Sequence, residues 1–161
     1  MELSPTYSPN KRILYTKTKL PAMFWSKDLA KVDQIVNSSS DLFFASGCSV
    51  LHFPGKYGEK EMSFLPLDDD SFFVGREVTG FLDLAPGFWF LDLPECEQVT
   101  FKLPNDCTFE DLVSRSEEVS GSLPLEFVDK LLLKHVSIFE DKEKDGLAGL
   151  SVELQYFFGW T

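Results

Sequence analysis

Short apolar stretches separated by turn residues fill the middle of this 161-residue chain. Between Asp41 and Leu103, stretches of ordinary strand length alternate with Gly, Pro and Asp. The predicted strands are Leu42–Ala45, Cys48–Phe53, Met62–Leu65, Ser71–Val74, Glu77–Leu84, Phe88–Leu93 and Gln98–Leu103. A parallel crossover needs about a dozen or more residues, so helices cannot join these strands. The sheet is therefore predicted to be mainly antiparallel.

The segments on either side supply further elements. Apolar spacing predicts helices over Lys27–Val36, Thr108–Val119 and Leu125–His135. Alternating residues predict strands over Lys11–Lys19, Val136–Phe139 and Leu150–Phe158. The expected fold is α+β: a mainly antiparallel β-sandwich or incomplete barrel with two or three helices packed on one side. Residues 1–10 are predicted to be a flexible N-terminal arm, and residues 11–161 a single β-rich domain.

Charge is unevenly distributed along the chain. Residues 1–60 carry 8 basic and 5 acidic side chains, whereas residues 61–161 carry 7 and 21, within a total net charge of −11. A phosphate backbone would be repelled by the acidic part, so nucleic-acid binding through this body is not expected. A basic protein partner would be attracted instead.

No set of residues predicts catalysis, a metal or a cofactor. Cys48 and His52 are four apart, but a structural zinc site normally shows two close ligand pairs. The chain has no nucleophile-elbow, phosphate-loop or dinucleotide motif. His52 is interpreted as a strand residue with one hydrogen bond, and His135 as a residue at a helix C-terminus. A non-enzymatic function is favoured.

The location is predicted from three absences. There is no secretory signal at the N-terminus and no apolar run near the ~20 residues of a membrane span. The cysteines are odd in number and form no CxxC pair. An intracellular protein, in cytoplasm or nucleus, is therefore expected.

Adjacent aromatic residues occur on several predicted strands. Because neighbours on a strand point to opposite faces, both faces of such strands must be apolar and need cover. Helices can supply that cover, and a partner protein is the alternative. The predicted partner-binding residues are Phe24, Trp25, Asp83, Asp92, Glu95, Glu97 and Trp160, with Trp160 as the anchor.

Two short segments resemble known families. Gly80–Leu93 resembles the hairpin of cupin-type barrels, but no histidine lies between positions 53 and 134 to build a cupin metal site. Phe24-Trp25 and Tyr156–Trp160 resemble the ends of a nucleoplasmin-like core, which implies an acidic histone-binding β-sandwich. The intervening length and glycines do not match that family, so neither resemblance identifies one.

These observations favour a non-enzymatic, acidic protein-interaction module, a subunit of a homo- or hetero-oligomeric assembly that binds a basic or aromatic-lined partner surface. One alternative is the histone-chaperone-like sandwich. The other is a β-barrel that binds a small molecule, or an enzyme, with an aromatic-lined cavity. Its lining is predicted to be Phe72, Phe88, Phe90 and Phe101, with Asp83 or Asp92 as the polar group.

Overall fold

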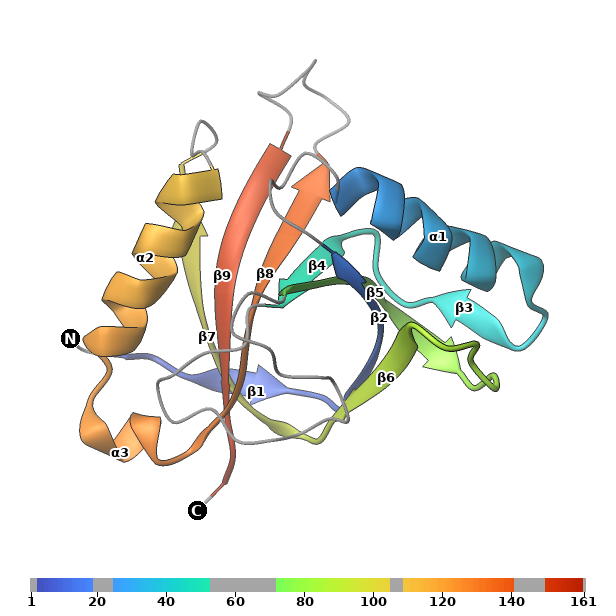
Figure 1. Cartoon of the computed structure of the whole chain (residues 1–161). Helices are drawn as coiled ribbons and strands as arrows, with labels where there is room; N and C mark the ends of the chain where they lie inside the picture. Colours follow the sequence, from blue (N-terminus) through green and yellow to red (C-terminus); the bar gives the residue numbers. More distant parts are fainter. Residues whose placement is uncertain (1–2, 19–24, 53–71, 105–108, 141–149, 161) are drawn as a thin grey trace.

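A computed structural model of the chain describes residues 3–18, 25–52, 72–104, 109–140 and 150–160. Within these ranges, nine strands form one antiparallel sheet (Figure 1). The strands are β1 (Thr6–Ser8), β2 (Lys11–Thr18), β3 (Leu42–Phe44), β4 (Ser49–His52), β5 (Phe72–Gly80), β6 (Phe88–Leu93), β7 (Cys96–Leu103), β8 (Leu131–Glu140) and β9 (Leu150–Phe158). The helices are α1 (Trp25–Ser38), α2 (Phe109–Gly121) and α3 (Leu125–Val128). The predicted α+β class with a mainly antiparallel sheet is confirmed.

Chain connectivity makes the sheet curve. The strand order is β1-β7-β9-β8-β4-β5-β2-β6, and β3 pairs with β5 beside this path. The strands at the two ends of this order are joined by very short connections: β1 leads into β2 through Pro9-Asn10, and β6 into β7 through Pro94-Glu95. Because two residues cannot span an extended sheet, its ends must approach one another, and Figure 1 shows the strands arching.

The two faces of this curved sheet are packed differently. On the outer face, α1 covers Leu14 and Val78 through Val32 and Val36. On the same face α2 covers β7, β8 and β9, in a second cluster of buried residues. The inner face forms one continuous cluster with members from β2 and from β4 to β9. The helices therefore leave the inner face of the sheet to other contacts.

The predicted helix over Leu125–His135 is wrong beyond its first turn. Residues 125–128 form the short helix α3, and from Leu131 the chain is strand β8, which pairs with β9 and β4. The run Leu131–Leu133 suits a helix or a doubly buried strand equally well, and sheet pairing decides between them. His135 consequently lies in the sheet and not at the end of a helix.

Three other predicted segments differ from the described structure or lie outside it. Ser71–Val74 and Glu77–Leu84 were predicted as separate strands, but β5 runs without interruption through Gly75. The arm predicted over residues 1–10 contains β1, which pairs with β7, so residues 6–8 are held to the sheet. The strand predicted over Met62–Leu65 lies outside the described residues.

No helix in the described ranges is long and apolar enough to cross a membrane.

Candidate ligand-binding site

Aromatic side chains form the centre of the inner face. Tyr15 of β2, Phe73 of β5 and Trp89 of β6 come from adjacent strands. The Phe73 ring centroid lies 6.4 Å from that of Tyr15 and 6.0 Å from that of Trp89, with the Trp89 ring edge-on. Phe157 of β9 belongs to the same buried cluster. Aromatic rings can stack on other flat groups and attract cations to their faces.

Two buried histidines continue this face. His52 Nδ1 lies 3.0 Å from the carbonyl oxygen of Lys134, and the His52 ring stacks at 6.2 Å on Phe73. The His135 ring lies edge-on to Phe157, with centroids 4.7 Å apart. Burial lowers the pKa of His52 to about 4 and that of His135 to about 3. Both side chains are therefore neutral at pH 7.

The hydrogen bonds of His135 define its tautomer. Its Nε2 lies 2.6 Å from Gln155 Oε1, which also accepts a 3.0 Å hydrogen bond from Ser137 Oγ. The amide nitrogen of Gln155 faces the Glu153 carboxylate at 3.5 Å, so the amide oxygen is the atom that faces His135. His135 Nε2 must then carry the proton and donate it, which leaves Nδ1 as an acceptor.

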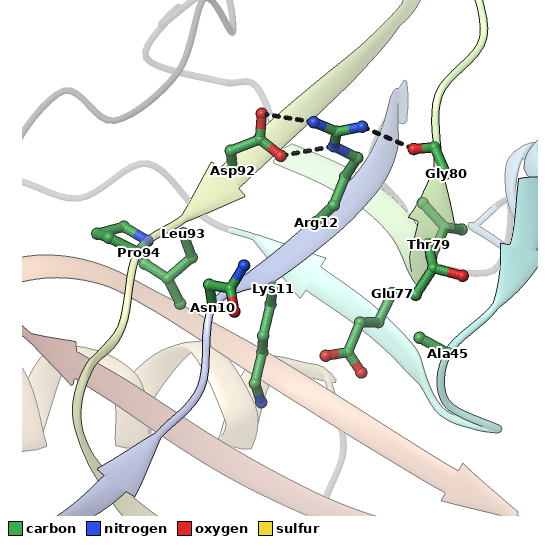
Figure 2. Close-up of a pocket in the computed structure, with 11 residues that line it drawn as sticks. Asn10, Lys11, Arg12, Ala45, Glu77, Thr79, Gly80, Asp92, Leu93 and Pro94 are labelled. Atoms are coloured by element: carbon green, nitrogen blue, oxygen red, sulfur yellow. Dashed lines mark hydrogen bonds and ion pairs between the residues drawn. The ribbon is translucent and has the colours of Figure 1, made fainter.

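A cavity of about 700 Å³ opens at one end of strands β2, β5 and β6. This volume lies within the usual range for small-molecule sites. Its walls include Lys11 and Arg12 from β2, Glu77 from β5, and Asp92 and Leu93 from β6 (Figure 2). Leu93 also belongs to the inner-face cluster, so the cavity adjoins that face.

The charged groups of this cavity are paired on one side of the sheet and unpaired on the other. Arg12 binds Asp92 through two hydrogen bonds of 2.6 and 3.2 Å and donates a third to the carbonyl of Gly80. Lys11 and Glu77 point away from this ion pair, toward the inner face (Figure 2). The Glu77 carboxylate makes no hydrogen bond or ion pair with any residue in the described ranges.

Lys11 connects the cavity with the aromatic face. Its Nζ lies 5.4 Å from the centroid of the Phe157 ring, within the range of a cation–π contact. The ring therefore already holds a positive charge, and the half-buried Glu77 carboxylate is available to hold another. Chemically, the site combines an aromatic surface with an acid that forms no ion pair among the described residues.

The structure does not bring together the residues predicted to bind a partner. Asp83, Glu95 and Trp160 are exposed at separate places, and Asp92 is held in its ion pair with Arg12. Glu97 lies on β7, and Trp25 begins α1. Phe24 lies outside the described residues. Among the described members of this set, Asp92 lines the cavity, and the partner-binding role of all seven residues remains a prediction.

The predicted aromatic lining falls on the wrong face. Phe72 and Phe101 pack in the outer cluster that contains residues of α1 and α2, and Phe88 and Phe90 pack in the outer cluster beside α1. The inner face carries the neighbours Phe73 and Trp89 instead. An error of one position reverses the face of every side chain in a strand, and that is the error here.

Comparison with known proteins finds likenesses among solved structures. No family model matches the chain, and no curated protein does. Solved structures do match over nearly its whole length.

The C-terminal domain of EcmrR matches with a TM-score of 0.61 and 14% identity, covering 99% of this chain and 98% of that one. In a complex of EcmrR with DNA, the chain spans 58% of the EcmrR chain. A structure of SAV2435 bound to tetraphenylphosphonium matches with a TM-score of 0.51 and 12% identity, covering 98% and 94%. At these identities the likeness shows the fold.

These structures correct the predicted function. The prediction of an acidic module that binds a basic protein is wrong, because the fold is that of domains such as SAV2435, which holds a small hydrophobic cation. The histone-chaperone-like alternative implies a sandwich of two sheets, whereas the described strands form one. The small-molecule alternative agrees better with the fold, although its lining residues differ.

Proposed function

We propose that this chain is a ligand-binding domain for small, hydrophobic, positively charged molecules. The observation that carries the proposal is the unpaired Glu77 carboxylate in a 700 Å³ cavity that adjoins an aromatic face. The likeness to SAV2435, which is bound to tetraphenylphosphonium, supports the choice of a hydrophobic cation. No catalytic role is assigned to any residue.

Each part of the site has a role in this proposal. Glu77 supplies the negative charge that attracts a cation into the cavity. Trp89, half-buried beside Phe73 on the adjoining inner face, supplies apolar area and a ring face for the organic part of the ligand. Arg12 and Asp92 neutralise one another and hold the ends of β2 and β6 together at the cavity wall.

Titration of the protein with tetraphenylphosphonium tests the proposal. We expect binding with a 1:1 stoichiometry and quenching of tryptophan fluorescence, because Trp89 belongs to the inner face. Glu77→Gln should weaken binding roughly tenfold, since it removes one close charge while keeping the size of the side chain. Isothermal titration calorimetry measures both affinities.

Asp83→Asn is the matched control. It removes the same charge from an exposed position outside the cavity, so it should change the affinity less than twofold. An equal loss in both variants would show that only the net charge of the protein matters. No saturable binding to the wild-type protein would contradict the proposed function.

A further inference from the structure

Two buried hydrogen-bond acceptors lie on the inner face without a partner. His135 Nδ1 and Gln98 Oε1 are shielded from solvent and make no hydrogen bond with any residue that the structure describes. His135 is 97% buried. A buried polar atom without a partner costs free energy, so it normally marks a place for water or for a ligand group.

Both acceptors adjoin the same aromatic ring. Gln98 of β7 is the direct cross-strand neighbour of Phe157 of β9. On the other side of β9, the His135 ring lies 4.7 Å from that of Phe157. Because paired residues share a face, the two acceptors flank this ring on the inner side of the sheet.

The ring connects the acceptors with the cavity. Lys11 lines the cavity, and its Nζ lies over the Phe157 ring at 5.4 Å. A ligand that enters beside Glu77 and displaces the Lys11 side chain would reach Phe157 and the acceptors next to it.

The chemistry of the acceptors defines the complementary group. His135 donates through Nε2 to Gln155, so its Nδ1 offers only a lone pair. The Gln98 oxygen also accepts only. The proposed function places the positive charge of the ligand at Glu77, so the fitting group at these acceptors is a neutral N–H or O–H donor.

We infer that the natural ligand carries a neutral N–H or O–H donor, such as an aromatic amine, which binds His135 and Gln98 at the end remote from its cationic group. This inference rests on the proposed function, because it assumes that Glu77 receives the cation. It assigns His135 and Gln98 as residues that select among hydrophobic cations.

Two isosteric probes test the inference: (4-aminobenzyl)triphenylphosphonium and (4-methylbenzyl)triphenylphosphonium. They share the cation and the aromatic rings and differ in one amino group against one methyl group. A purely apolar site would bind the methyl probe at least as tightly as the amino probe. Unpaired acceptors would instead bind the amino probe more tightly, because it donates a hydrogen bond to them. We expect the wild-type protein to prefer the amino probe roughly tenfold.

Gln98→Met removes one acceptor with little change in size and breaks no described hydrogen bond. It should reduce the preference to about threefold or less. Gln34→Met, the same change on the exposed side of α1, should leave the preference at its wild-type value. In ¹⁵N spectra, the Nδ1 resonance of His135 should shift with the amino probe and stay in place with the methyl probe.

The outcomes separate this inference from the proposed function. Equal binding of both probes to the wild-type protein, or a preference that Gln98→Met leaves unchanged, would overturn the inference while the proposed function stands. Failure of both probes to bind would overturn the proposed function and the inference with it.

Discussion

Replacing Gly75 by alanine is expected to destabilise the fold by about 3 kcal/mol. Gly75 lies in the middle of β5, between β2 and β4. A Cβ atom added there would overlap the backbone oxygen of Leu14 and would stand 2.8 Å from Cδ1 of Tyr15. The first contact is with backbone, so the strands themselves would have to separate. Urea denaturation followed by circular dichroism measures the change in the free energy of unfolding.

Gly47→Ala is the matched control for this variant. Gly47 lies between β3 and β4, and an added Cβ would meet no atom within 4 Å. Its substitution should change the free energy of unfolding by less than about 0.5 kcal/mol. Similar midpoints for both variants would show that β5 can move away from β2 at little cost.

The effect of Gly75→Ala should extend to ligand binding. The glycine leaves the space in which the Tyr15 ring lies on the inner face. Any outward shift of this ring changes the aromatic surface beside the cavity. Both the stability of the fold and the shape of the site therefore depend on the lack of a side chain at Gly75.

The class of the fold could be predicted from turn spacing, because seven strands without room for crossovers must pair antiparallel. Two details could not be predicted in this way. The run Leu131–Leu133 has no alternation to distinguish a helix from a buried strand, and its pairing with β9 decides. The second detail is which of two neighbouring aromatic side chains in a strand faces the inner side of the sheet.

The sequence does not show which side chains face inward wherever both faces of a strand are apolar. In Phe72-Phe73 and in Phe88-Trp89-Phe90, either set of rings could face the cavity, because neither neighbour is polar. The outer helices settle the matter by covering Phe72, Phe88 and Phe90. In β2 the sequence does help to assign side chains to a face. Lys11 and Lys17 share a face with Tyr15, whereas Arg12 lies on the opposite face. Glu77 could not be singled out, since one acid among 26 has no distinguishing neighbour in sequence.

Acid is expected to unfold this domain between pH 6.5 and about 4, because two histidines are buried in their neutral form. Burial lowers the pKa of His52 to about 4 and that of His135 to about 3, whereas both titrate near 6.5 in the unfolded chain. Above pH 6.5 neither state binds these protons, and the contribution is constant. Below pH 6.5 the unfolded state binds protons that the folded state does not bind, so the free energy of unfolding falls.

The expected size of this effect is large. Two protons correspond to a slope of about 2.7 kcal/mol per pH unit at most. Over the range from pH 6.5 to 4 the loss is on the order of 5 kcal/mol, comparable with the whole stability of a small domain. Urea midpoints measured at half-unit intervals of pH give this slope directly.

Replacing the histidines identifies the groups responsible. These are the two histidines of the chain, so His52→Phe should halve the slope and the double variant with His135→Phe should remove it. Phenylalanine keeps the ring contacts with Phe73 and Phe157. A slope unchanged in the double variant would assign acid unfolding to the carboxylates.

A ligand that donates a hydrogen bond to His135 Nδ1 should hold this ring neutral to still lower pH, because protonation would remove the accepting lone pair. The amino probe should therefore lower the pH of half-unfolding more than the methyl probe does.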